Sequence, residues 1–246
     1  MKKLIAVLAI ISFNAHAAPD CRELPSCESL GFICSAEECS DLKALSCPFD
    51  LSKKACFPKE KECEVGDILY NDLKCYDSGC GKTPIAVVYD AEYRLAMPPL
   101  QNKNTIWGGF GYDIPDLETC GYSDDFETCG TDGKTNTQII INYGKENELS
   151  FPPAEFCYNS TYGDTPQGTY WLPSVKEVFL YGRSYAVNKE KIKQGLAVFN
   201  HTPNARMWSS TERGSTSAWS VQYTDESKGA YAKQGDISMQ HCITGY

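Results

Sequence analysis

The stretch Tyr170-Trp171-Leu172-Pro173-Ser174-Val175-Lys176-Glu177 decides the fold prediction, because it marks the start of a helix. Ser174 and Glu177 have the spacing of a capping box, in which the two side chains satisfy backbone amides of the first turn. The box comes directly after Pro173. We therefore predict a helix that begins after Ser174, followed by a further, more polar helical stretch over 188–198.

Beyond these helices the pattern changes to that of strands. The segments predicted as strands are 206–211, 217–224, 229–234 and 238–244. The second of them alternates, with Trp219, Val221 and Tyr223 on one face and Ser220 and Gln222 on the other. We expect a strand of this kind to bury one face.

The preceding part of the chain is predicted to contain three further strands, 66–70, 84–90 and 93–97, of which the last two form a hairpin. A short helix is expected over 152–159, with Pro152 in its first turn. The sequence pattern of the run 137–143 is compatible with either a strand or a helix. Helices followed by antiparallel strands indicate an α+β fold.

The stretch 102–136 is rich in Gly and Asp and contains Cys120 and Cys129. It is too long and polar for an ordinary connection, and functional loops are often of this kind. The alternative is an irregular loop that is pinned by a disulfide and binds nothing.

The order of four phrases resembles one family. After 170–177 come Met207-Trp208-Ser209-Ser210-Thr211-Glu212, then 218–223, then His241-Cys242-Ile243. This series is similar to the Lcl C-terminal domain family and to the Fibrobacter-type major paralogous domain. The resemblance implies that 64–246 forms a C-type-lectin-like domain, with two or three short helices and antiparallel strands. It also implies a helix near 137–143 and a disulfide between Cys157 and Cys242, since a Cys of the first helix is bonded to one of the last strand in this pattern.

The N-terminus is predicted to be a secretory signal peptide over residues 1–17. Lys2 and Lys3 precede the apolar run 4–11, and small residues follow at Ala15 and Ala17. We therefore expect a secreted protein, extracellular or periplasmic, that begins near Ala18. No second stretch approaches the roughly 20 apolar residues of a membrane helix.

All 13 Cys follow the predicted signal peptide, and export to an oxidising compartment favours disulfides. Residues 18–63 contain seven Cys and few large apolar residues, which predicts a small Cys-rich disulfide module. Further along, Cys120 is expected to pair with Cys129, and Cys75 with either Cys80 or Cys63. The odd total leaves at least one Cys for covalent self-association. Zinc is a weaker alternative, because the spacings are irregular.

Charge narrows the choice of partner. The formal net charge is −9, and loss of Lys2 and Lys3 with the signal peptide lowers it to −11, so a nucleic-acid binder is not expected. From Tyr170 onward, however, nine Lys and Arg outnumber six Asp and Glu. Ligands of lectin-like folds usually meet the loops between the late strands, which places the expected binding surface near Arg206, Arg213, Tyr223, Lys228 and Tyr231.

No metal or cofactor is expected. The carboxylates between Asp113 and Asp132 do not have the spacing of a calcium loop, and the calcium-binding phrases of true C-type lectins do not occur. Formylglycine-generating oxidases share the general fold and bind copper through a Cys pair, as Cys75 and Cys80 would here, but their Arg-Gly-Gly-Ser-Trp phrase does not occur. We therefore expect no enzymatic activity. Trp171, Trp208 and Trp219 are expected in the core.

Two functional hypotheses follow. The first is a secreted or cell-surface, adhesin-like protein that recognises a glycan or a protein surface through the lectin-like domain. The second is a structural, disulfide-cross-linked component of a bacterial envelope or surface assembly.

Overall fold

The computed structural model describes residues 42–47, 50–58, 60–76, 82–203, 206–224, 227–236 and 238–246. Strands β1 (Leu42–Cys47) and β2 (Asp50–Pro58), of which only the backbone is described, pair as an antiparallel hairpin. The predicted signal peptide and Cys80 lie outside the described residues, as does most of the predicted Cys-rich module.

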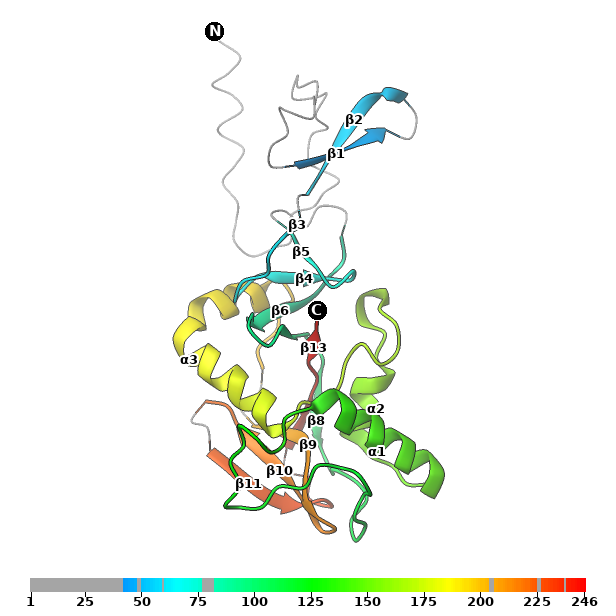
Figure 1. The fold of residues 1–246 in the computed structure, drawn as a ribbon, viewed down its shortest axis with the longest axis vertical. Coiled ribbons are helices and arrows are strands. Elements are labelled where there is room, and N and C mark those ends of the chain that lie inside the picture. Colours follow the sequence, from blue (N-terminus) through cyan, green and yellow to red (C-terminus); the bar gives the residue numbers. More distant parts are fainter. Residues whose placement is uncertain are drawn as a thin grey trace.

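The rest of the described chain contains two sheets, three α-helices and a short 3-10 helix, Tyr162–Asp164, joined by loops (Figure 1). The five-stranded sheet has the order β11-β10-β9-β12-β8, with strands β8 (Gln101–Thr105), β9 (Arg206–Gly214), β10 (Ser217–Gln222), β11 (Ser227–Ala232) and β12 (Ser238–His241). The six-stranded sheet has the order β13-β7-β6-β4-β5-β3, with strands β3 (Glu60–Lys61), β4 (Ile68–Tyr70), β5 (Cys75–Tyr76), β6 (Pro84–Asp90), β7 (Leu95–Met97) and β13 (Thr244–Gly245). Neighbouring strands are antiparallel except β9 and β12. The α+β class predicted from the sequence is confirmed.

Helix α1 (Gly133–Asn147) settles the open stretch 137–143 as helix. Asp132 caps it, since its Oδ1 accepts a hydrogen bond of 2.9 Å from the backbone amide of Thr135. Ile140 and Ile141 are buried on the inner side of the helix. The run of Ile therefore supplies a buried helix face.

Helices α2 (Pro152–Asn159) and α3 (Val175–Ala197) begin where the sequence predicts. The capping box is present at α3: Glu177 Oε2 accepts from the amide of Ser174 at 2.7 Å, and Ser174 Oγ accepts from the amide of Glu177 at 3.3 Å. The separate helix predicted from residue 188 is part of α3. A kink at Asn188, with φ −112° and ψ 25°, marks its expected start.

The core lies on both sides of the five-stranded sheet, with α3 on one side and α1 and α2 on the other (Figure 1). Trp219 and Val221 of β10 pack in the α3 cluster, and Ala218 packs in the cluster with α1 and α2. The expectation that this strand buries only one face is wrong. Ser220 is fully buried, and its hydroxyl lies 2.7 Å from that of Ser238.

Three disulfides occur among the described residues. Cys157 of α2 is bonded to Cys242, with 5.4 Å between the Cα atoms. Cys120 is bonded to Cys129, and Cys75 to Cys63. Two partners were predicted for Cys75, and the structure bonds it to Cys63. The alternative pairing with Cys80 is therefore wrong.

Several predicted boundaries also differ from the structure. The predicted strand 238–244 is two strands, β12 and β13, which belong to different sheets, because the chain crosses between the sheets at Cys242 and Ile243. The predicted loop 102–136 begins with β8 and ends inside α1. Strand β3 pairs in the six-stranded sheet, so this sheet extends to the N-terminal side of the boundary predicted after Cys63.

Candidate functional site

A buried ion pair lies under one end of the five-stranded sheet. Glu212, in β9, and Lys233, directly after β11, form a salt bridge with both side chains removed from solvent. Burial raises the pKa of Glu212 and lowers that of Lys233, while the hydrogen bond between them opposes both shifts. A buried charge is tolerated when it is paired and its remaining hydrogen-bonding capacity is used.

The two side chains of this pair form further hydrogen bonds with the loop that follows β8. Lys233 Nζ donates a hydrogen bond of 2.7 Å to the carbonyl oxygen of Tyr112, and the amide of Ile114 donates to Glu212 Oε2 at 3.4 Å. Lys233 Nζ also lies 4.9 Å from the ring centre of the buried Trp107. The ion pair therefore holds the loop from below.

Backbone hydrogen bonds fix the same loop along its length. The amides of Trp107 and Gly108 donate to the carbonyl of Lys233 at 2.8 and 3.1 Å, and that of Gly111 donates to Ser215 at 2.8 Å. The amide of Cys120 donates to Glu212 at 2.9 Å. Residues 106–120 thus form an ordered layer on β9 and on the turn after it, the green segment beside β9–β11 in Figure 1.

Close packing of this layer requires glycine at residue 108. Gly108 has φ +101°, a conformation that favours glycine. A β-carbon there would lie 2.2 Å from the carbonyl oxygen of Ser150. The Gly-rich composition of the loop therefore serves its close approach to the segment between α1 and α2.

This loop and the disulfide segment that follows it expose apolar side chains. The exposed fractions are 41% for Ile106, 44% for Phe110, 47% for Tyr112 and 62% for Tyr122. The guanidinium of Arg213 lies 4.2 Å from the ring centre of Tyr122. We call the set Ile106, Phe110, Tyr112, Tyr122 and Arg213 the aromatic loop surface.

The segment between Cys120 and Cys129, which includes Tyr122, packs against the indole of Trp219. The carbonyl of Cys120 accepts a hydrogen bond of 2.9 Å from the indole of Trp219, and Tyr122 packs edge-on against that indole with ring centres 5.2 Å apart. Phe126 is buried on the same indole at 5.0 Å. The disulfide loop therefore covers the core at Trp219 and presents Tyr122 outward.

The structure does not bring the five predicted binding residues into one site. Tyr223 is buried, with its hydroxyl bonded to the carbonyl of Pro203 at 3.3 Å. Arg206 bonds the hydroxyl of Tyr231 at 2.9 Å, whereas Lys228 lies 3.8 Å from the ring centre of Phe126.

The strand register places Tyr231 and Lys228 on opposite faces of the five-stranded sheet. In β11, Tyr231 lies opposite Ala218 and packs with it in the cluster on the side of α1 and α2. Lys228 lies opposite Val221, which packs on the side of α3. Of the predicted set, only Arg213 belongs to the aromatic loop surface. The other members of this surface lie in the Gly- and Asp-rich stretch 102–136, where five aromatic residues interrupt a polar sequence.

Several carboxylates of this region have partners within the loop or on α3. Asp124 accepts from the amide of Gly121 at 2.6 Å, Glu118 accepts from the amide of Thr131 at 2.9 Å, and Glu127 forms a salt bridge with Arg183. The side chains of Glu118, Cys120 and Cys129 converge within 4.8 Å in the described part of the chain, and the two sulfurs are bonded to each other. A disulfide does not supply the thiolates that a metal binds.

The tryptophans of the family-like phrases and His241 lie in the core. Trp171, Trp208 and Trp219 are buried, as predicted. His241 is fully buried, and burial lowers its pKa to about 3. No helix among the described residues has the length and apolar character that crossing a membrane requires.

Neither protein-family models nor curated protein sequences gave a match to this chain. Among solved structures, the chain is similar to a fimbrial protein from Bacteroides ovatus, with a TM-score of 0.56 and 16% sequence identity. The match covers 75% of this chain and 49% of the fimbrial protein, so the chain spans about half the length of that structure. At this level of identity, the similarity establishes a shared fold.

Proposed function

We propose that this chain is a non-enzymatic binding protein of the bacterial surface or periplasm that recognises another macromolecule through the aromatic loop surface. One observation carries the proposal: four apolar side chains are exposed on two adjoining segments, a loop that a buried ion pair and a series of backbone bonds hold in place and the segment closed by the Cys120–Cys129 disulfide. A preordered surface loses little conformational entropy on binding.

The residue types of this surface favour a protein partner. Tyr and Arg are enriched among the side chains that dominate protein interfaces, and Arg213 already lies on the ring of Tyr122. The negative charge of the chain opposes polyanionic ligands such as sulfated polysaccharides. A neutral glycan is the second ligand class, because exposed Tyr rings also present an apolar face to sugars.

We also propose that the domain has a C-type-lectin-like fold. Support comes from the order of the elements, short helices followed by antiparallel strands, and from the Cys157–Cys242 bond between a helix and the end of β12. The phrases around Trp171, Trp208 and Trp219 build the frame that the resembling family has, and their burial agrees with that role.

The absence of enzymatic activity is part of the proposal. After the predicted signal peptide, the histidines of the chain are His201 and His241. His241 is fully buried, so its ring does not reach a bound substrate, and burial lowers the pKa of His201 as well. Neither is suited to general acid–base catalysis near neutral pH.

Binding of the labelled protein to a glycan array and to intact bacterial and host cells tests the proposal. The variant Phe110→Ser/Tyr112→Ser/Tyr122→Ser is expected to lose binding by about 30-fold or more, since hot-spot residues each contribute about 2 kcal/mol. Tyr93→Ser is the control, because Tyr93 is a 47% exposed aromatic residue in the β6–β7 turn. Equal binding of the folded triple variant and the control would refute a role for this surface.

A structural role in a surface assembly is the second candidate. It is favoured by the fold shared with a fimbrial protein and by β11, which pairs on one side with β10 and forms an edge of the sheet within the described chain. Edge strands offer unpaired backbone groups for strand addition. Electrophoresis without reducing agent, together with size-exclusion chromatography, distinguishes the candidates: covalent or non-covalent multimers support assembly, and a monomer at all concentrations supports a binding protein.

A further inference from the structure

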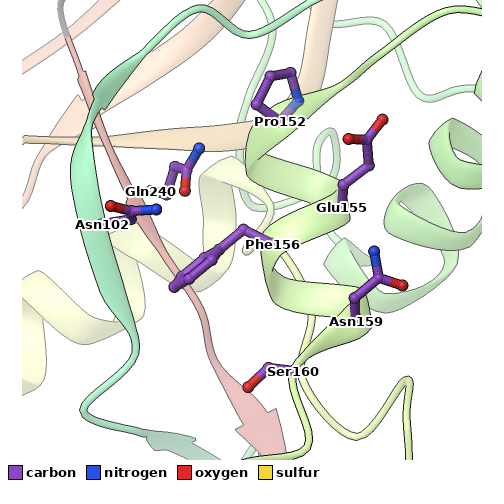
Figure 2. A pocket seen from close by; sticks show the side chains of 7 residues that line it. All are labelled: Asn102, Pro152, Glu155, Phe156, Asn159, Ser160 and Gln240. Carbon is purple, nitrogen blue, oxygen red and sulfur yellow. The ribbon is translucent and has the colours of Figure 1, made fainter.

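A hollow lies between α2 and strands β8 and β12, at the edge of the five-stranded sheet that is farthest from β11 (Figure 2). Its volume is about 510 Å³. It is lined by Asn102, Pro152, Glu155, Phe156, Asn159, Ser160 and Gln240. Asn102 of β8 and Gln240 of β12 are directly paired in the strand register, so they project from the same face of the sheet toward α2.

The walls of the hollow are fixed relative to each other. Cys157 of α2 is bonded to Cys242, two residues after Gln240, and the Cα atoms are 5.4 Å apart. Pro152 starts α2, and the amide of Phe151 donates to Glu155 Oε1 at 2.8 Å. The hollow therefore lies beside a covalent bond between its two walls and is largely preformed, as small-ligand sites usually are.

Gln240 is the observation that points to a ligand. Only 5% of the residue is exposed, and its Oε1 accepts no hydrogen bond from the described residues. Buried polar atoms of native proteins are nearly always hydrogen-bonded, because leaving one unpaired is unfavourable. Figure 2 shows Gln240 beside Asn102, with the ring of Phe156 extending from α2 toward the strands that carry them.

The chemistry of the lining selects the ligand class. Amides, a hydroxyl and a carboxylate line the hollow together with the apolar side chains of Phe156 and Pro152, and no Lys or Arg is among the described residues of its lining. Hydroxyl groups both donate and accept hydrogen bonds, so they match amide side chains. An anion would meet Glu155 without a positive partner. We propose that this hollow binds a neutral sugar residue, with the apolar face of the pyranose on Phe156 and a hydroxyl paired with Gln240.

This site is separate from the aromatic loop surface and does not depend on the function proposed for it. Saturation-transfer NMR of the purified chain with the methyl glycosides of glucose, mannose and galactose tests the proposal, with methyl sulfate and choline as charged probes. At least one glycoside is expected to bind. Binding of none of the three glycosides, or of a charged probe alone, would overturn the proposed ligand class.

Three variants test the residues. Gln240→Met keeps the length of the side chain and removes the unpaired amide, so it is expected to weaken glycoside binding about tenfold or more without lowering the melting temperature. Phe156→Leu, which keeps apolar bulk without a ring, is expected to weaken binding as well. Gln234→Met, beyond β11 at the far edge of the sheet, is the matched control and retains binding.

The outcomes separate this site from the proposed function. Unchanged glycoside binding by both folded pocket variants would refute the assignment, as would a lowered melting temperature of Gln240→Met with unchanged binding, which indicates a purely structural amide. The variant Phe110→Ser/Tyr112→Ser/Tyr122→Ser is expected to keep glycoside binding. Loss in that variant would place the sugar on the aromatic loop surface and overturn the pocket.

Discussion

The carboxylate of Glu177 lies directly against the backbone of Gly133. A β-carbon on Gly133 would be 2.2 Å from Glu177 Oε2 and 2.6 Å from the amide nitrogen of Ser174. The first residue of α1 thus packs onto the capping box that starts α3, and the two helix starts share one buried contact. Trp171 adds to it, since its indole donates to Glu177 Oε1 at 3.2 Å.

The first prediction concerns this contact. Gly133→Ala is expected to lower the free energy of unfolding by about 1–3 kcal/mol, because the added methyl overpacks a site bounded by backbone atoms. Denaturant titration measures the change. Gly121→Ala is the control, since a β-carbon there meets only ordinary contacts at 3.5 Å from Asp124. Equal stability of the two variants would contradict the packing described at Gly133.

The second prediction is a pH dependence from Glu177. Burial raises its pKa from 4.5 to about 7. Between these values the folded state binds more protons than the unfolded state, so the free energy of unfolding falls as pH rises, by about 3 kcal/mol at most. Below pH 4.5 this contribution is fully present, and above pH 7 it is lost.

Comparison with Glu177→Gln isolates the effect, since Gln also fits the capping box. The stability of the wild type relative to this variant is expected to decline from pH 4.5 to pH 7. His241 acts in the opposite direction, because its lowered pKa destabilises the fold as pH falls from 6.5 toward about 3. His241 is unchanged in both proteins and cancels in the difference. A difference that is constant with pH would contradict the raised pKa.

The third prediction concerns the Cys157–Cys242 bond. It joins residues 85 apart in sequence, whereas the Cys120–Cys129 bond joins residues only 9 apart. By the chain-entropy estimate, removal of the first with Cys157→Ala/Cys242→Ala costs about 4–5 kcal/mol, and removal of the second costs about 3 kcal/mol. Thermal unfolding of both double variants measures the order. A larger loss for the short loop would contradict this account.

The fourth prediction concerns the ion pair under the aromatic loop surface. Lys233→Met leaves Glu212 buried without its partner and is expected to cost about 3–5 kcal/mol. Lys233→Met/Glu212→Gln is expected to recover part of this loss, because no unpaired charge remains. Limited proteolysis between residues 106 and 120 should be faster in the single variant than in the double. A double variant less stable than the single would contradict the role of the unpaired charge.

The local parts of the fold were predictable because short-range rules decide them. The capping box at Ser174, the Pro at the start of α2 and the β6–β7 hairpin each depend on residues a few positions apart. The α+β class followed from their order. The helix α1 was ambiguous, since its Ile residues favour a strand and only the packed structure decides between the two.

The candidate site was less predictable, for a different reason. Lys233 and Glu212 are residue types that are normally exposed, so the sequence gives no sign that they form a buried pair. The predicted set followed from the charge of the last third of the chain and from the lectin-like resemblance, but Tyr223 packs in the cluster with α3 and Tyr231 packs on the side of α1 and α2. Only three-dimensional packing places Tyr122 beside Arg213.

The position of β12 between β9 and β8 has a consequence for the order of folding. Strand β8 gains its sheet partner only when residues 238–241 have been synthesised, and non-local pairing of this kind is slow. Cys242 arrives last of the 13 Cys, and eleven of the others precede Cys157. In an oxidising compartment, Cys157 therefore emerges among earlier thiols while its native partner is still absent. Maturation of this chain is expected to depend on disulfide exchange, and a catalyst of isomerisation should raise its yield more than an oxidant alone.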